Sequence, residues 1–215
     1  MTEGVEGLVA AGGSGRRLGR GPKALLRLAD ETLVERAARV LRPLCGRVLV
    51  AAPSEHVDEV ATLLSDPSVA VIAGGSTRME SMRRLVEQAR GESLLITDVV
   101  HPFIDQDLAR SVLEAARRNG AACAALPNGD YVLEPDTGKS FAAGSLWTLQ
   151  KPIACRIEAL RTALDAGSEE MGVAQALERS GHAVTLVPGK PTNVKVTHAA
   201  DWQLAEAIER FERDP

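Results

Sequence analysis

The chain has 215 residues, 45% of them hydrophobic, which is enough to bury the core of one ordinary α/β domain. A formal net charge of −4 leaves no basic stripe that could replace the counterions of a nucleic acid, and no apolar run is long enough to span a membrane. The three cysteines, Cys45, Cys123 and Cys155, lack the spacing of a zinc site or a disulfide framework, which favours the reducing cytoplasm. We therefore expect one domain over residues 1–215, with neither a nucleic acid nor a membrane as its partner.

The first candidate site is a glycine-rich stretch that follows an apolar run, a predicted strand, near the start of the chain. Glycines leave backbone N–H groups free to surround phosphates, and Arg17 and Lys23 bring positive charge close behind them. The stretch has neither the Gly-Lys-Ser/Thr of a P-loop nor the glycine spacing of a dinucleotide-binding turn. We predict a triphosphate site here; the alternative is a solvated turn with scattered basic residues. The backbone of this site is predicted to come from Ala10, Ala11, Gly12, Gly13 and Gly15.

Apolar runs then alternate with amphipathic segments. A capping box, Thr32-x-x-Glu35, begins a helix that ends before Pro43. The strands and helices predicted after it occupy residues 47–53, about 56–64, 69–72, a stretch around Leu85, and 93–98. This order predicts an α/β fold with a Rossmann-like, doubly wound and mostly parallel sheet, in which ligands bind at the carboxyl ends of the strands.

A second glycine pair, Gly74-Gly75, follows the 69–72 strand and leads into a helix that carries Arg78 and Ser81. Glycines let a planar base lie close to the backbone, and a hydroxyl and a charge near a helix N-terminus can contact a nucleotide. Taken alone, the segment is also an ordinary strand-to-helix turn. Together with the first glycine-rich stretch, it is the better candidate for the base pocket.

Asp98 ends the 93–98 strand. A carboxylate at this place beside a triphosphate is a natural ligand for Mg²⁺, which takes few protein oxygens and keeps phosphates and waters as its other ligands. Asp98 could instead cap a helix, but Asp105 is better placed to cap the next helix, around Leu108 to Ala115. We predict that Asp98 is the metal ligand.

The last third of the chain begins with turn residues around short extended pieces, which predict a β-arm over residues 128–151 that stands off the sheet. Lys195 is predicted to lie within a short strand at residues 192–197. The other predicted elements are helices at 157–166, 173–179 and 201–211 and a strand at 183–187.

These pieces together resemble the 2-C-methyl-D-erythritol 4-phosphate cytidylyltransferase family and the related ribitol-5-phosphate cytidylyltransferases over nearly the whole chain. The motifs that carry the resemblance are Ala-Ala-Gly…Gly-Arg-Arg…Pro-Lys, Gly-Gly…Arg-x-x-Ser, Asp-x-x-x-Pro-Phe, Leu-Trp…Gln-x-Pro and Asn-Val-Lys-Val-Thr. The resemblance implies that Arg17, Lys23 and Lys195 are the catalytic cations and that Asp98 holds Mg²⁺. It also implies that Gly74 and Ser81, with the backbone of residues 10–12, read cytosine, and that the 128–151 arm joins a homodimer and reaches the partner's acceptor pocket.

The chain departs from the family pattern on the acceptor side. Tyr131 stands where the family has a threonine, Ala143 replaces an arginine, and Thr192 replaces an aspartate. The family's Gln-Thr-Pro-Gln is replaced here by Gln150-Lys151-Pro152-Ile153. The family's arginine before the proline Pro102 is replaced by His101. Loss of an arginine that binds a phosphate costs about 1.5–3 kcal/mol, so the acceptor side is expected to differ from that of the family.

The leading hypothesis is a Mg²⁺-dependent cytidylyltransferase that moves CMP from CTP to a phosphorylated small acceptor and releases pyrophosphate. By resemblance, the acceptor is 2-C-methyl-D-erythritol 4-phosphate. One alternative is a catalytically silent nucleotide-binding homologue with a regulatory or structural role. Another is a nucleotidyltransferase of the molybdenum-cofactor type, although such a protein would not be expected to carry Asn193-Val194-Lys195-Val196-Thr197.

Overall fold

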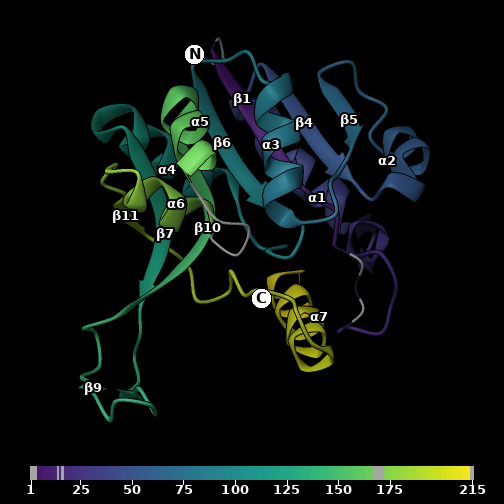
Figure 1. Cartoon of the computed structure of the whole chain (residues 1–215). Helices are drawn as coiled ribbons and strands as arrows, with labels where there is room; N and C mark the ends of the chain where they lie inside the picture. The colour runs from purple at the N-terminus through teal and green to yellow at the C-terminus, as the bar shows by residue number, and fades with distance from the viewer. Residues whose placement is uncertain (1–3, 14, 16, 167–171, 214–215) are drawn as a thin grey trace.

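The computed structural model describes residues 4–13, 15, 17–166 and 172–213. Its centre is a seven-stranded sheet in the order β11-β7-β10-β6-β1-β4-β5, with helices on both faces (Figure 1). All neighbouring strands are parallel except β10, which is antiparallel to both β6 and β7. The expected mostly parallel, doubly wound α/β sheet is therefore confirmed. Its strands are β1 (Val5–Ala10), β4 (Arg47–Ala52), β5 (Val69–Ala73), β6 (Ser93–Asp98), β7 (Ala121–Pro127), β10 (Trp147–Arg156) and β11 (Thr185–Pro188).

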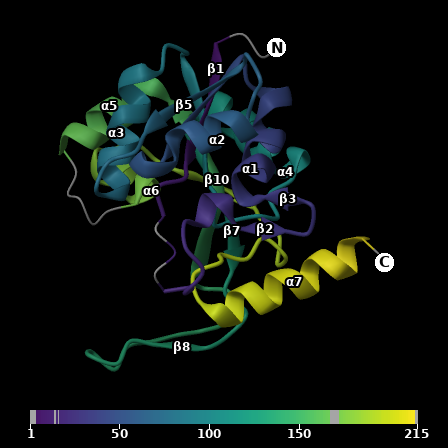
Figure 2. The same ribbon diagram turned by 90° about the vertical axis from the view of Figure 1, so that its right-hand side faces the viewer.

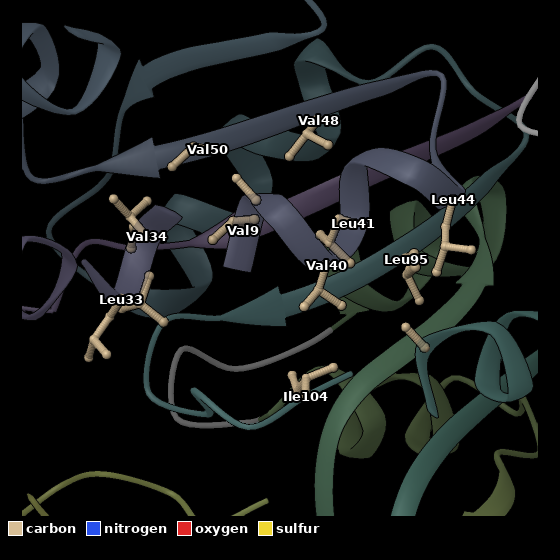
Figure 3. Close-up of a cluster of buried hydrophobic side chains, with 14 of the residues drawn as sticks. Val9, Leu33, Val34, Val40, Leu41, Leu44, Val48, Val50, Leu95 and Ile104 are labelled. Carbon is tan, nitrogen blue, oxygen red and sulfur yellow. The ribbon is translucent and has the colours of Figure 1, made fainter. Parts of the chain in front are cut away.

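Two hydrophobic cores lie on the two faces of the sheet. The first joins α1 and α4 to alternate residues of β1, β4 and β6, such as Val9, Val50 and Leu95, several of which Figure 3 shows. The second joins α3, α5 and α6 to the intervening residues, such as Leu8 and Ile96. Strand side chains alternate between faces, so a run of apolar residues supplies both cores at once. The helices are α1 (Leu33–Leu41), α2 (Val57–Leu63), α3 (Arg78–Gln88), α4 (Gln106–Asn119), α5 (Ile157–Ala166), α6 (Val173–Arg179) and α7 (Ala199–Arg213), with single 3₁₀ turns at Lys23–Leu25, Arg42–Leu44 and Ser54–His56.

Local signals in the sequence explain where two of these helices begin. The Thr32 hydroxyl accepts a hydrogen bond from the Glu35 N–H at 3.3 Å, and the Glu35 carboxylate accepts one from the Thr32 N–H at 2.7 Å, which confirms the capping box of α1. Asp105 caps α4 by accepting a hydrogen bond from the Leu108 N–H at 2.8 Å. None of the described helices is both long and apolar enough to cross a lipid bilayer.

Residues 128–149 form an extension of the β7–β10 pair that projects beyond the sheet, as Figures 1 and 2 show. Its outer part contains the short strands β8 (Val132–Leu133) and β9 (Ser140–Phe141), which pair with each other. The last two residues of the predicted arm, Gln150 and Lys151, are buried at the end of the sheet.

The strand expected at residues 192–197 is absent, and the prediction is wrong. The segment is irregular, and its one backbone hydrogen bond to the residues that follow β6 runs from the Val196 N–H to the Val100 carbonyl at 2.7 Å. Both sides of β10 are already paired, with β6 and β7, so the sheet offers this segment no free edge there. Another two-stranded ladder joins β2 (Arg27–Leu28) and β3 (Glu31–Thr32) ahead of α1.

Candidate functional site

A cavity of about 490 Å³ opens at the carboxyl ends of β1 and β6. This is the end of a parallel sheet at which ligands bind in doubly wound folds. A slightly larger hollow, of about 530 Å³, lies at the opposite end of the strands, where oppositely charged side chains surround it and no group of cations converges among the described residues. The cavity at the carboxyl ends is lined by Ala10, Gly12, Gly13, Gly15, Arg17, Lys23, Gly75, Ser76, Thr77, Arg78, Ser81, Asp98, Val99, Val100, Lys195 and Thr197.

The glycine-rich loop after β1 forms one wall of this cavity. Gly15 has a φ of +64°, and a side chain there would overlap the carbonyl oxygen of Gly21, so the turn requires glycine on both counts. The Lys23 N–H donates to the Gly13 carbonyl at 3.0 Å, which closes the loop. Arg20 then lies over the ring of Trp202 at 5.2 Å and joins the loop to α7. Ala11, one of the predicted nucleotide contacts, is fully buried and donates its N–H to β4 instead.

Lys23 is the buried cation of this wall. It is 7% exposed, and its Nζ donates to the Val196 carbonyl at 2.8 Å. Burial, followed by the charges of Arg17 and Lys195, lowers the pKa of Lys23 below its ordinary value. The C-terminal segment thus fixes the ammonium of a residue from the first loop, while Arg17 and Lys195 remain exposed and able to move towards a ligand.

The opposite wall comes from the turn between β5 and α3. Ser81 is buried, and its hydroxyl accepts a hydrogen bond from the Gly75 N–H at 2.9 Å and donates to the Thr77 carbonyl at 3.0 Å. A Cβ on Gly74 would lie 3.0 Å from the Ala52 carbonyl and 3.1 Å from the Ser81 hydroxyl, so only glycine fits without a shift. The predicted base-side residues Gly74, Ser81 and Arg78 are therefore brought together around the start of α3.

Asp98 lies at the floor of the cavity between two partners. Its Oδ1 is 2.6 Å from His101 Nδ1, and its Oδ2 accepts a hydrogen bond from Arg78 at 2.9 Å. Burial opposes ionisation of this carboxyl group, but the hydrogen bond and charge of His101, and then the charges of Lys151 and Arg78, outweigh it and hold the pKa of Asp98 well below its usual range. Asp98 is ionised at neutral pH although it is only 5% exposed.

The donor set around Asp98 fits Mg²⁺ only together with a phosphate ligand. Asp98 is the one carboxylate among the described residues that line the cavity, and no group of three or more His, Cys, Asp or Glu side chains in the described part of the chain is placed to hold a metal ion. Mg²⁺ in nucleotide sites takes one or two carboxylates and completes its octahedron with phosphates and water. Oδ2 can become free for a metal because its partner Arg78 has a side chain that is 44% exposed and can swing away.

A lysine that the site prediction did not include lies next to this group. Lys151 is 4% exposed, and burial lowers its pKa to about 8 even though Asp98 raises it. Its backbone is fixed, because the Asn193 side chain donates to the Lys151 carbonyl at 2.7 Å and the Gln150 amide donates to the Asn193 carbonyl at 3.1 Å. The signal that could have pointed to Lys151 is its place next to the apolar residues of a strand. The sequence pattern alone shows only that Lys151 replaces the threonine of the family's Gln-Thr-Pro-Gln.

The three residues expected on the acceptor side do not line this cavity. Tyr131 and Ala143 lie on the extension of β7 and β10, where both are exposed. Thr192 lines a separate hollow of about 480 Å³, together with Phe103 and Lys190. Within one chain, the structure therefore separates these positions from the nucleotide-side residues.

Residues 5–210 match the family described as 2-C-methyl-D-erythritol 4-phosphate cytidylyltransferase. The chain belongs to this cytidylyltransferase family. A 2-C-methyl-D-erythritol 4-phosphate cytidylyltransferase from Thermus thermophilus is 37% identical over 213 residues, which cover 96% of this chain and 97% of the relative. The relative of the same name from Deinococcus radiodurans is 36% identical over 208 residues, 94% of this chain and 88% of its own.

Solved structures of cytidylyltransferases in this family have the same fold. The crystal structure of a Thermus thermophilus enzyme superimposes with a TM-score of 0.78 at 32% identity and covers 94% of this chain and 98% of its own. That of the 4-diphosphocytidyl-2C-methyl-D-erythritol synthase from Anaerococcus prevotii gives a TM-score of 0.84 at 18% identity over 97% of both chains, a likeness of fold alone. Membership of the cytidylyltransferase family makes the protein a nucleotidyltransferase and decides against the molybdenum-cofactor type.

Proposed function

We propose that this protein transfers CMP from CTP to 2-C-methyl-D-erythritol 4-phosphate and releases pyrophosphate. The observation that carries the proposal is the family match over residues 5–210, with the family's glycine-rich loop and cations converging on one cavity. Four cations and one carboxylate line that cavity in the described part of the chain. Such a surplus of positive charge suits a triphosphate and the charge that develops during its cleavage.

The reaction needs positioning more than covalent help from the protein. An oxygen of the acceptor's phosphate attacks the α-phosphorus of CTP, the bond from that phosphorus to the β-phosphate oxygen breaks, and pyrophosphate takes the bonding electrons. We assign Arg17 and Lys23 to the triphosphate, together with the backbone of the glycine-rich loop, and Lys195 to the reacting phosphates. Because Val196 fixes Lys23 in place, its charge is aligned before the substrate arrives.

We assign recognition of cytosine to the wall formed by Gly74 and Ser81, with backbone atoms of residues 10–12 facing it. Asp98 would hold Mg²⁺ together with the triphosphate. When bound, Mg²⁺ would neutralise phosphate charge and favour departure of pyrophosphate. Arg78 would then be released from Asp98 and could bind a phosphate oxygen itself.

The residues of the arm, 128–151, are assigned to a homodimer. Tyr131 is 71% and Leu133 60% exposed, and Trp147 and Leu149 are also exposed, so the extension presents apolar surface that a second copy would cover. In the dimer, Tyr131 and Ala143 would line the acceptor side of the neighbouring site. The three free, buried cysteines and the use of CTP suit the cytoplasm, which we propose as the location.

Pyrophosphate release from CTP and 2-C-methyl-D-erythritol 4-phosphate, with and without Mg²⁺, tests the proposed activity. Release that depends on both substrates supports it, whereas CTP binding without release from this or any polyol phosphate would favour the silent homologue. For the arm, Tyr131→Thr combined with Ala143→Arg should lower the KM for 2-C-methyl-D-erythritol 4-phosphate and leave the affinity for CTP unchanged. A protein that sediments as a monomer, or a double variant that loses CTP binding, would contradict the role given to the arm.

A further inference from the structure

One charged group near the cavity has no direct partner in the described part of the chain. Lys151 is only 4% exposed as a residue, yet its ammonium makes no hydrogen bond or ion pair with a described residue. Lys23, the other buried lysine of the site, has such a partner in the Val196 carbonyl. Burial removes the hydration of an ammonium, and an ammonium without a replacement partner is therefore costly.

Lys151 lies near Asp98. The antiparallel β10–β6 pairing runs from Arg156–Ser93 to Ile153–Ile96, and Lys151 and Asp98 each lie two residues beyond its last pair. Asp98 lines the cavity. Lys151 is not among the described residues that line it, but it is close enough to Asp98 for the charge of each group to shift the pKa of the other.

Asp98 does not serve as the direct partner of this lysine. One of its oxygens pairs with His101 at 2.6 Å and the other with Arg78 at 2.9 Å. The charge of Asp98 acts on Lys151 at longer range, as do the opposing charges of Arg78 and Lys195. With Lys151 included, the described residues at the site carry an excess of four positive charges. An incoming anion would balance them.

The order of the strands indicates which anion this is. Along the carboxyl edge of the sheet, Gly74 follows β5, the glycine-rich loop follows β1, Asp98 ends β6 and Lys151 lies on β10. The base and the triphosphate occupy the part from β5 to β1 in the proposed function. Lys151 lies on the other side of Asp98, towards the arm.

We infer that Lys151 binds the phosphate group of the acceptor, a phosphorylated polyol, from within the same subunit as the nucleotide site. This inference rests on the proposed function and assigns a phosphate ligand that the arm does not provide. The described arm offers few cations, and its Lys139 lies over the ring of Phe141, 4.8 Å from its centre. A phosphomonoester carries about −1.5 to −2 charges near neutral pH, which suits a buried ammonium that has no other direct partner among the described residues.

The test compares wild type with two variants. Lys151→Met keeps a side chain of similar length and removes the charge, and Lys151→Arg is the conservative variant that keeps the charge. Lys190→Met is the matched control, because Lys190 is a half-exposed lysine that pairs with Asp105 away from the cavity. Steady-state pyrophosphate release gives the KM for each substrate. Non-phosphorylated 2-C-methyl-D-erythritol is assayed as a competitive inhibitor, since it has the polyol but lacks the phosphate.

For Lys151→Met we expect kcat/KM for 2-C-methyl-D-erythritol 4-phosphate to fall roughly 10- to 100-fold, with partial recovery in Lys151→Arg. The KM for CTP should change less than about twofold, and so should the inhibition constant of the non-phosphorylated polyol, since neither involves the lost contact. Lys190→Met should match wild type. Lys151→Gln serves as a second neutral variant if the methionine variant does not fold.

Three results would overturn the inference: an unchanged KM and kcat/KM for the acceptor, an equal rise in the KM for CTP, or an equal loss of affinity for the non-phosphorylated polyol. The second would assign Lys151 to the triphosphate, and the third would give it only a role in the shape of the pocket. Failure of the proposed function is a separate outcome, because wild type itself would then release no pyrophosphate with this acceptor.

Discussion

Replacing Lys151 by methionine should stabilise the ligand-free protein at neutral pH. Methionine has a similar length and can keep the apolar contacts of the lysine stem, while the charge without a direct partner in the described structure is removed. The physical cause is burial, which lowers the pKa of Lys151 from 10.5 to about 8 against the raising effect of Asp98. A lysine whose pKa is lower in the folded than in the unfolded state lowers the free energy of unfolding at every pH at which it is charged.

The size and the pH window of the effect follow from that shift. At pH 7 the lysine is charged in both states, and the shift from 10.5 to about 8 corresponds to a penalty of about 3 kcal/mol, since one unit is worth 1.36 kcal/mol. Between about pH 8 and 10.5 the unfolded chain binds more protons than the folded one, so the stability of wild type rises with pH. The methionine variant should melt about 6–12 °C higher at pH 7, and this gap should close towards pH 10.5.

Urea and thermal denaturation followed by circular dichroism at pH 7, 8.5 and 10 measure the gap. Lys190→Met is the control, because the Lys190 side chain is 44% exposed and its loss should change the free energy of unfolding by less than about 1 kcal/mol without a pH trend in this window. A methionine variant less stable than wild type at pH 7 would refute the reasoning, and so would a gap that stays constant with pH. Either result would mean that other groups in the folded protein compensate the positive charge of Lys151.

Further variants test the other charged groups. Lys23→Ala should lower kcat/KM for CTP by about 100-fold or more while the melting temperature falls only a few degrees, because in the proposed function the cation acts mainly on the transition state; a comparable loss of both would indicate a structural role. Asp98→Asn should shift the Mg²⁺ titration of activity to roughly tenfold higher concentration with the fold retained, and an unchanged titration would remove Asp98 from the metal site. Glu209→Ala takes away the 2.7 Å partner of the buried Arg36 and should cost about 3–5 kcal/mol in urea unfolding, with the KM for CTP unchanged.

Features that depend on nearby residues were predictable from the sequence. The capping box of α1 and the Asp105 cap of α4 each join positions three residues apart, so the sequence pattern itself contains the geometry. The sheet follows from the alternation of apolar runs and helices, and the site lies at its carboxyl end as the fold requires. Most residues of the two glycine motifs meet in the cavity for the same reason.

Features that depend on distant pairing were not predictable. The alternation of Val194 and Val196 with polar residues favours a strand. Alternation indicates only that one side of an extended segment is buried, and it does not show that a neighbouring strand has a free edge for pairing. The burial of Lys151 depends on the register of β10 with β6, which a single sequence does not contain. The resemblance to the family puts Thr192 on the acceptor side, whereas within this chain Thr192 lines a separate hollow.

The bond from Lys23 to the Val196 carbonyl also has a consequence for how the protein is made. It joins residues 173 positions apart, so the first loop can gain this contact only after Val196 has been synthesised. Until then, the Lys23 ammonium lacks this carbonyl as a partner. A ribosome-bound chain that ends before Val196 contains the residues of β1, β4 and β5, but it lacks the residue that fixes the ammonium. The alignment of this ammonium therefore follows the synthesis of the central strands.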